Sequence, residues 1–158
     1  MRKLLTVVPE RCTGCLICEL VCSFYHTKEF NPKRSRIDVL RDEEKGVNIP
    51  IICRQCAKPL CQEACPSDAI HRDEETGAMF VDGSKCIGCR LCIAACPFGA
   101  PSVDPTTMLT TICDLCRGDP RCVKYCPRDA VLYVRPDTIS LIRRQQSAKK
   151  ITRFPLRR

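Results

Sequence analysis

Short alternations of apolar and polar residues along the chain predict strands that pair as hairpins. Two pairs of runs flank turns and two more runs follow: residues 36–40 with 47–52, residues 69–72 with 79–82, then 108–112 and 130–135. The first turn ends in Gly46 and the second contains Gly77, as turns between strands commonly do. We therefore expect short hairpins, connected by segments of a different character.

Cysteines occupy those connecting segments and fall into four groups of four. The first and third groups have the spacing C-x2-C-x2-C-x3-C, the second has C-x2-C-x4-C-x3-C, and the fourth has C-x2-C-x5-C-x3-C. The quartets are Cys12, Cys15, Cys18 and Cys22; Cys53, Cys56, Cys61 and Cys65; Cys86, Cys89, Cys92 and Cys96; and Cys113, Cys116, Cys122 and Cys126. All 16 cysteines of the chain belong to a quartet, so one repeated kind of site accounts for all of them.

The spacing suits a [4Fe–4S] cubane, whose iron corners lie so close together that three ligands must come from one tight loop. Gly14 and Gly88 lie inside the first and third loops, where the backbone has to pass close to the cluster. The fourth cysteine follows the third by four residues, about one helical turn, so we expect it to start a short helix and point away from its own loop. A proline after three of the quartets ends that helix, and Ser23 replaces it in the first.

Two other uses of many cysteines fit less well. Disulfides would strain one another, because three cysteines three residues apart share one loop. Zinc sites use C-x2-C pairs separated by a longer stretch and do not need a fourth cysteine four residues on, followed by proline. Zinc is the remaining alternative, and iron–sulfur clusters are the favoured interpretation.

Composition and charge agree with buried clusters. The 158 residues include no Trp, five Phe and three Tyr, so aromatic packing contributes little to the core. The formal charge of +8 counts cysteines as neutral, whereas four oxidised clusters with their thiolates would contribute about −8. The basic side chains are therefore better explained as compensation for buried anionic clusters than as a nucleic-acid site.

The sequence indicates a cytoplasmic protein without catalytic chemistry of its own. The apolar run at residues 4–8 is too short for the core of a signal peptide, and no window approaches the roughly 18 apolar residues of a membrane span. No P-loop, G-x-G-x-x-G or H-E-x-x-H motif is present, and His26 and His71 stand alone as surface or packing residues. Arg54, Lys85 and Lys124 lie near cysteines, where solvated surface charge is the simpler interpretation.

The stretches CTGCLICELVC, CRQCAKPLCQEACP, CIGCRLCIAACPFGA and CDLCRGDPRCVKYCP resemble the four-cluster iron–sulfur subunit of the DMSO reductase superfamily. The resemblance covers about residues 6–134. It implies an α+β fold of two fused, bacterial-ferredoxin-like halves with short hairpins and short helices, within a domain of residues 1–136. It also implies that quartet one shares its clusters with quartet four, and quartet two with quartet three.

Four [4Fe–4S] clusters and their ligand sets follow from this resemblance. The outer pair would be ligated by Cys12, Cys15, Cys18 and Cys126, and by Cys113, Cys116, Cys122 and Cys22. The inner pair would be ligated by Cys53, Cys56, Cys61 and Cys96, and by Cys86, Cys89, Cys92 and Cys65. Spacing alone indicates the four quartets, and the pairing comes from the family.

The resemblance further implies an electron-transfer subunit that relays single electrons between a catalytic subunit and a redox partner. The short chain is most similar to the small subunits of tungsten aldehyde oxidoreductase and benzoyl-CoA reductase complexes, so the catalytic partner would contain a tungsten or molybdenum pterin. A flavin subunit or a ferredoxin is the other candidate partner. The alternatives are a free-standing polyferredoxin and, less favoured, a structural or regulatory iron–sulfur module.

Residues 137–158 form a basic C-terminal tail without cysteine. Its basic residues are Arg143, Arg144, Lys149, Lys150, Arg153, Arg157 and Arg158. Its apolar residues are Ile139, Leu141, Ile142, Ile151, Phe154 and Leu156. A solvated terminus is one explanation. Because these apolar residues have little local chain to bury them, we favour an arm that docks on a partner subunit or on a second copy of the chain.

Overall fold

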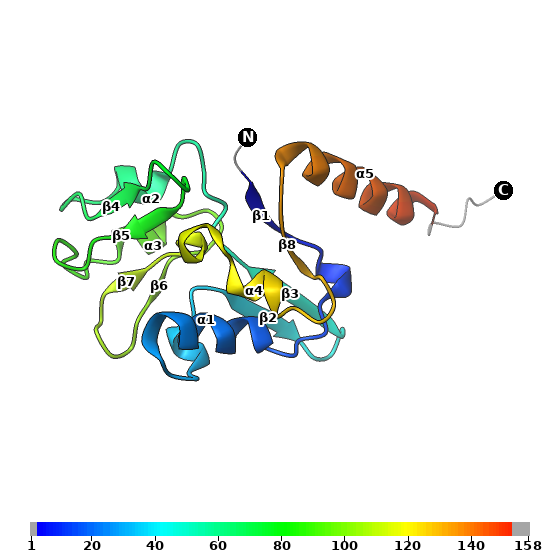
Figure 1. Ribbon diagram of the computed structural model, residues 1–158, viewed down its shortest axis with the longest axis horizontal. Coiled ribbons are helices and arrows are strands. Elements are labelled where there is room, and N and C mark those ends of the chain that lie inside the picture. Colours follow the sequence, from blue (N-terminus) through cyan, green and yellow to red (C-terminus); the bar gives the residue numbers. More distant parts are fainter. Residues whose placement is uncertain (1–2, 153–158) are drawn as a thin grey trace.

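Short helices and small antiparallel sheets alternate along the chain (Figure 1). The computed structural model describes residues 3–152, and in that range the strands form four two-stranded sheets. The elements are β1 Leu4–Val7, η1 Pro9–Arg11, α1 Ile17–Thr27, η2 Pro32–Arg34, β2 Asp38–Asp42, β3 Val47–Ile51, α2 Leu60–Glu63, β4 Ile70–Arg72, β5 Met79–Val81, α3 Leu91–Ala95, β6 Ser102–Val103, β7 Thr110–Thr111, η3 Leu115–Gly118, α4 Arg121–Lys124, β8 Val131–Val134 and α5 Pro136–Thr152. This mixed content of helix and small sheet is of the predicted α+β type.

The two hairpins expected from the alternating runs are confirmed. Strand β2 pairs with β3, with Leu40 opposite Ile49, and β4 pairs with β5, with Ile70 opposite Val81. In the second hairpin the alternation buries Ile70 and leaves Phe80 exposed. Period-two patterning was therefore sufficient to identify both turns and both strand pairs.

The other two sheets join segments that local patterning does not pair. Strand β8 pairs with β1 at the opposite end of the chain, with Leu5 facing Tyr133. Strand β7 pairs with the two-residue strand β6, with Ser102 facing Thr111. The apolar run at residues 4–8 thus contributes a strand to the fold, whereas from the sequence it was considered only as a possible leader.

Each quartet leads into a helix, but the position of the helix differs from the expectation. The third cysteine lies within the helix in every quartet, as Cys61 does in α2. The fourth lies at the helix end or beyond it in three quartets, as Cys65 does, whereas Cys22 lies inside α1. The expectation that the fourth cysteine starts the helix was therefore wrong. Proline follows the fourth cysteine in three quartets, and these helices are short; Ser23 stands there in α1, which continues to Thr27.

The buried residues form two hydrophobic cores, and cysteines contribute to both. One contains Leu5, Ile52, Leu115 and Val131 together with the thiols of Cys18, Cys22 and Cys122. The other contains Ile70, Met79 and Ile112 together with the thiols of Cys53, Cys61 and Cys92. Cys113 packs against both cores, so it marks the place where they meet.

Polar contacts connect the two core regions. Arg34, next to α1, donates from Nε and Nη2 to Asp104 Oδ2 at 3.1 and 3.0 Å, and Asp104 lies beside β6. Asp104 is 6% exposed, so this pair is shielded from solvent on the carboxylate side. The Ser102 hydroxyl also donates to the carbonyl of Ser35, at 3.5 Å.

The C-terminal tail is helical where the structure describes it. Helix α5 leaves the end of β8 and runs along the outside of the molecule (Figure 1). Ile139 and Ile142 are half-buried, Gln146 Nε2 donates to Glu10 Oε2 at 3.0 Å, and Leu141 and Ile151 are exposed. The tail residues 153–158 lie outside the described residues. Within 3–152, no helix combines the length and apolar character needed to cross a membrane.

Candidate metal centres

The four cysteine loops share one backbone feature. The residue just before the second cysteine has a positive φ in every loop: Gly14 at 69°, Gln55 at 51°, Gly88 at 69° and Leu115 at 57°. A left-handed residue turns the chain sharply, so that successive cysteines can face one centre. At two of these positions, Gly14 and Gly88, the sequence had already indicated a close passage of the backbone past the cluster. At Gly14 a Cβ would also come within 2.5 Å of Asn48 Oδ1 on β3, so a side chain there would require Asn48 to move.

Three thiol sets each line a common cavity, and each contains one cysteine from a distant quartet. The sets are Cys12, Cys15, Cys18 with Cys126; Cys53, Cys56, Cys61 with Cys96; and Cys86, Cys89, Cys92 with Cys65. The fourth cysteine of a quartet reaches another loop because it lies past the helical turn that separates it from the third. The crossing is thus a result of local helix geometry.

The remaining four thiols gather where the two cores meet. Burial raises the pKa of the Cys113 thiol well above its usual value, and the nearby thiols of Cys122 and Cys22 raise it further. Burial likewise raises the pKa of Cys116 to about 11, with Cys22 again a neighbour. Cys22, Cys116 and Cys122 are all buried. Cys22 of the first quartet therefore lies among the first three thiols of the fourth.

The four thiols of each set are arranged as the ligands of one metal centre. Burial raises the pKa of Cys18 to about 12 and that of Cys53 to about 11, with neighbouring thiols adding to the shift. Without metal these two thiols stay protonated at neutral pH, and thiolate ligation would release those two protons. The 16 cysteines are free of disulfides. Four converging thiols per set match the ligation of iron–sulfur clusters by four cysteines.

Backbone amides donate hydrogen bonds to the sulfur atoms of the crossing cysteines. Ala69 N donates to Cys65 Sγ at 3.3 Å, Ala130 N to Cys126 Sγ at 3.2 Å, and Arg36 N to Cys22 Sγ at 3.3 Å. Such bonds stabilise negative charge on sulfur and help to set the reduction potential of an iron–sulfur centre. These amide donors fit a redox centre as well as a structural one.

Exposure differs between the sets in an ordered way. Cys15 and Cys89 are the exposed cysteines, and they belong to two different sets. The other two sets consist of buried and half-buried thiols, and Cys53 of one is an electrostatic neighbour of Cys113 of the other. The Cys53 and Cys113 sets, which we call the interior sets, therefore lie next to each other. Each of the other two sets has one thiol at the surface.

Gln55 connects the two interior sets. Its side chain is 6% exposed; Nε2 donates to the carbonyl of Cys113 at 2.7 Å, and Oε1 accepts from Met79 N at 2.7 Å. Reasoning from the sequence missed this residue. Aligning the four loops would have revealed it, because Gln55 occupies the place of Gly14 and Gly88, where a side chain needs a specific use.

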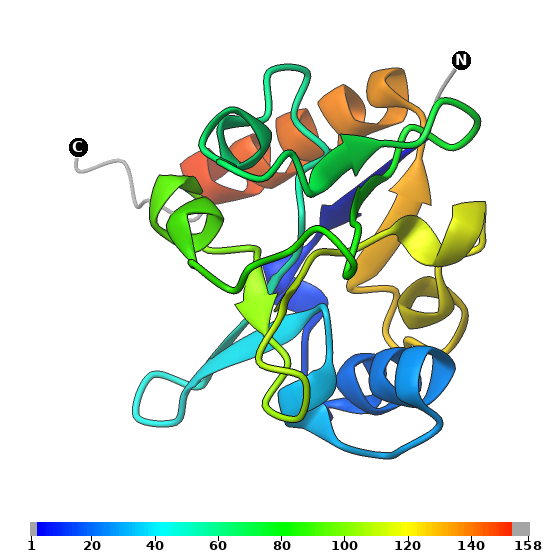
Figure 2. The same cartoon turned by 90° about the vertical axis from the view of Figure 1, so that its left-hand side faces the viewer.

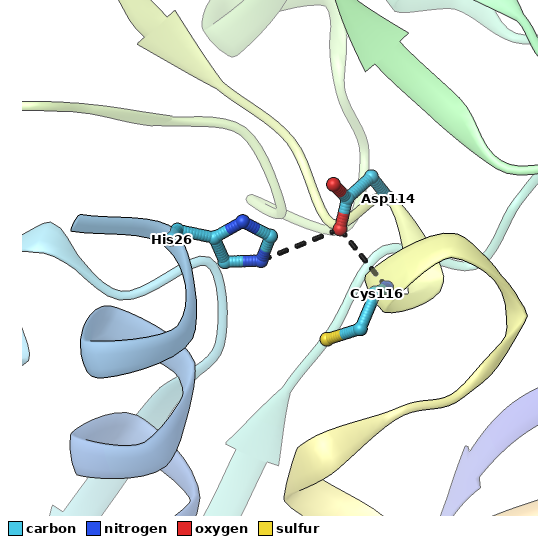
Figure 3. Close-up of side chains that lie close together, drawn as sticks. All are labelled: His26, Asp114 and Cys116. Atoms are coloured by element: carbon cyan, nitrogen blue, oxygen red, sulfur yellow. Dashed lines mark hydrogen bonds and ion pairs between the residues drawn. The ribbon is translucent and has the colours of Figure 1, made fainter. Parts of the chain in front are cut away.

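His26, Asp114 and Cys116 form a polar trio at the border of the Cys113 set (Figure 3). His26 Nε2 lies 3.4 Å from Asp114 Oδ1, the same oxygen accepts from Cys116 N at 3.0 Å, and Arg36 Nη1 lies 2.7 Å from Asp114 Oδ2. Burial lowers the pKa of His26 to about 4, and the charge of Arg36 lowers it too, so the ring is neutral at pH 7. The Cys116 thiol belongs to the Cys113 set, so this trio is a border of that centre.

Of the other residues singled out from the sequence, His71, Lys85 and Lys124 lie apart from the thiol cavities, whereas Arg54 lines the cavity of the Cys53 set. His71 is on β4 and its ring lies 5.5 Å from that of Phe80, as a packing residue. Arg54 lies over the ring of Phe98, at 5.9 Å from its centroid. Lys124 pairs with Asp119 at 2.8 Å on the surface, and Lys85 is exposed.

Comparison with known proteins places these loops among iron–sulfur proteins. A family model described as a 4Fe-4S dicluster domain matches residues 44–135, and a 4Fe-4S binding domain model matches residues 9–25. The polyferredoxin-like subunit of aliphatic sulfonate oxidoreductase from Pyrococcus furiosus is 42% identical, with 76% of this chain and 69% of the relative covered. The thiosulfate reductase electron transfer subunit PhsB of Salmonella typhi is 32% identical, with 91% and 81% covered.

The chain is also similar to a polypeptide of a reductase and to a solved structure. One of the polypeptides of anaerobic dimethyl sulfoxide reductase from Escherichia coli K12 is 38% identical, with 77% of this chain and 68% of the relative covered. A polypeptide of the active site complex BamBC of benzoyl coenzyme A reductase, as isolated, superposes with a TM-score of 0.51 at 24% identity, covering 98% of this chain and 92% of that one. The latter likeness establishes a shared fold.

Replacing Gln55 tests its role between the interior sets. Gln55→Ala leaves the Cys113 carbonyl and the Met79 amide without their partner, at a cost of about 2 kcal/mol. For a chain of this size we expect the thermal midpoint of the anaerobic holoprotein to fall by roughly 4–8 °C, measured by loss of visible absorbance.

Two comparison variants make this result specific. Gln145→Ala removes an exposed glutamine from α5 and should leave the midpoint unchanged. Gln55→Glu keeps the acceptor for Met79 N and loses the donor to Cys113, so it should also lower the midpoint. A wild-type midpoint for Gln55→Ala would show that the bridge contributes nothing.

Proposed function

The protein belongs to the family with a 4Fe-4S dicluster domain, and we propose that it is the electron-transfer subunit of an oxidoreductase complex. Curated relatives of this family include an electron transfer subunit and a polyferredoxin-like subunit of oxidoreductases. The observation that supports the proposal most directly is the gathering of all 16 cysteines into four thiol sets. An iron–sulfur cluster in such a set supplies a centre that accepts and releases one electron at a time.

We assign four [4Fe–4S] clusters to the four thiol sets. The proposed ligands are Cys12, Cys15, Cys18 and Cys126; Cys22, Cys113, Cys116 and Cys122; Cys53, Cys56, Cys61 and Cys96; and Cys65, Cys86, Cys89 and Cys92. Convergence of these thiols and the match of two 4Fe-4S family models to this chain support this assignment over zinc.

The proposed path through the molecule is linear. It begins at the set with exposed Cys15, passes the set of Cys113 and then that of Cys53, and ends at the set with exposed Cys89. Exposure of one thiol at each end and the contact of Cys53 with Cys113 through Gln55 support this order. The protein's contribution is to hold these thiols in fixed positions, so that electrons move without a change of shape.

The proposed domain organisation has two ferredoxin-like halves in residues 1–136 and a docking tail in residues 137–158. Two separate hydrophobic cores, each built around two thiol sets, support the division into halves. The exposed Leu141 and Ile151 on α5 support docking of the tail on another protein chain.

The partner that we propose is a larger catalytic subunit with a tungsten or molybdenum pterin. The relatives are subunits of oxidoreductases, which supports a catalytic partner, and this chain's short cysteine-rich sequence has no catalytic motif. We place the complex in the cytoplasm, because 16 free thiols persist in a reducing compartment. The alternative partner for the exposed apolar residues of the tail is a second copy of this chain.

Metal content and co-purification test the function together. Anaerobic purification from the native host should give about 16 irons per chain, visible absorbance that dithionite bleaches, and a stoichiometric larger partner. Zinc in place of iron would contradict the cofactor. A stable monomer with full iron would favour a free-standing polyferredoxin electron carrier instead of a subunit.

Single substitutions test the crossed ligand sets. Cys22→Ser should damage the centre of Cys113, Cys116 and Cys122, and Cys126→Ser should damage that of Cys12, Cys15 and Cys18. Each variant should lose or convert one cluster, seen as a loss of up to four irons and a changed electron paramagnetic resonance spectrum.

The pairing is distinguished by combining variants. If Cys22 belongs with quartet four, Cys22→Ser and Cys122→Ser together should cost no more iron than either alone. Cys22→Ser with Cys18→Ser should affect two centres. The reverse pattern would assign Cys22 to its own quartet.

Deletion tests the tail. Removing residues 137–158 should weaken assembly with the catalytic partner and leave the iron content unchanged, because the tail has no cysteine. Analytical ultracentrifugation and metal analysis of the same sample measure both. A complex of unchanged affinity would refute docking, and loss of iron would show that α5 supports the fold through contacts such as Gln146 with Glu10.

A further inference from the structure

The two neighbouring loops that hold the Cys53 and Cys89 sets combine exposed apolar side chains with positive charge. The apolar side chains are exposed by 49% at Leu60, 68% at Ile87, 51% at Leu91 and 48% at Phe98. Lys58 and Arg90 are the exposed basic residues. We call these six residues the Cys89 face. Large apolar side chains gathered in the open are typical of a surface that another molecule covers.

The members of the Cys89 face come from two neighbouring loops. Leu60 begins α2 and Leu91 begins α3, and these helices lie in contact, side by side in both views of the molecule (Figures 1 and 2). Lys58 and Phe98 line the cavity of the Cys53 set with Leu60, while Ile87 and Arg90 line that of the Cys89 set. The face therefore covers the two thiol sets at this end.

Charge on this face has one dominant sign. The loops at residues 53–65 and 85–98 contain four basic side chains, Arg54, Lys58, Lys85 and Arg90, and one acidic side chain, Glu63. The two cavity linings contain basic residues and no acidic ones. At the opposite end, near Cys15, the charges are mixed, because Arg11 and Arg128 lie beside Asp129, and α5 contacts Glu10 there.

Compensation of buried cluster charge explains the basic residues only in part. Compensation works best from side chains that are shielded with the cluster, whereas Lys58, Lys85 and Arg90 are exposed to water. Exposed charge of one sign instead raises the rate at which an oppositely charged protein finds the surface. Apolar contacts then form a small interface, as weak electron-transfer encounters require.

We propose that the Cys89 face is the docking site of a small, acidic, one-electron carrier protein. This inference rests on the proposed electron-transfer function and adds the class of the external partner and its place. In each encounter the carrier loses the one electron that the holoprotein gains, or the reverse, and no bond is made or broken. The basic rim orients the carrier, and the apolar centre excludes water above exposed Cys89.

Binding of flavodoxin, a strongly acidic flavin carrier, tests the proposal without electron flow. Both proteins are kept oxidised, and affinity is measured by titration calorimetry at low and at physiological ionic strength. We expect Lys58→Glu to weaken binding severalfold at low salt, and Lys58→Glu with Arg90→Glu to weaken it by about tenfold or more. The difference should shrink as salt screens the charges.

Lys45→Glu is the matched control. Lys45 is an exposed lysine at the tip of the β2–β3 hairpin, far from α2 and α3 (Figure 1), and its substitution should leave flavodoxin affinity unchanged. Basic cytochrome c should bind the double variant more tightly than the wild type. If Arg90→Glu lowers the iron content of the protein because Arg90 is next to Cys89, the affinity of the single Lys58→Glu variant for flavodoxin tests the docking site instead.

The outcomes separate this proposal from the function on which it rests. Wild-type affinity in the Lys58→Glu variant, equal weakening by Lys45→Glu, or no binding of flavodoxin to wild type would each overturn the docking site. Iron content and bleaching by dithionite are measured on the same samples. Full iron with failed docking refutes the Cys89 face alone, whereas wild-type protein without iron refutes the electron-transfer function.

Discussion

Every element of this protein depends on bringing thiols from distant parts of the chain to common centres. The chain contains no Trp, and cysteines form part of both hydrophobic cores, so the thiols contribute directly to the packing that holds these loops. Because each set draws its fourth thiol from another quartet, the centres also act as cross-links between segments. Metal-binding energy is therefore part of the folding energy.

The same arrangement supports the proposed path of electrons from one end of the protein to the other. The sets lie in two cores, and the cores meet at Cys113, where the Gln55 amide bridges a loop of one and a strand of the other. A buried amide with both hydrogen bonds made is rigid and uncharged, so it fixes the distance between interior centres without adding charge between them. Electron transfer along this path then requires fixed positions of the centres and no conformational change.

Much of this was visible in the sequence, and the rest was not for physical reasons. Spacing located the loops, and period-two patterning located the β2–β3 and β4–β5 hairpins, because both depend on neighbours in the chain. Pairing of β1 with β8 depends on residues more than a hundred positions apart, about which local pattern is silent. The helices begin earlier than expected, since the third cysteine is inside them. The crossing of the quartets came from family resemblance. Gln55 was missed because its place in a single loop looks ordinary until four loops are compared.

The β1–β8 pair has a consequence for synthesis on the ribosome. The chain emerges from its first residue onward, and β1 waits unpaired until β8, at residues 131–134, has left the exit tunnel. The thiols of Cys53 to Cys96 are complete well before that moment, whereas those at Cys12 to Cys22 need Cys113 to Cys126. The two thiol sets in the middle of the chain can therefore assemble before the two sets that join its ends.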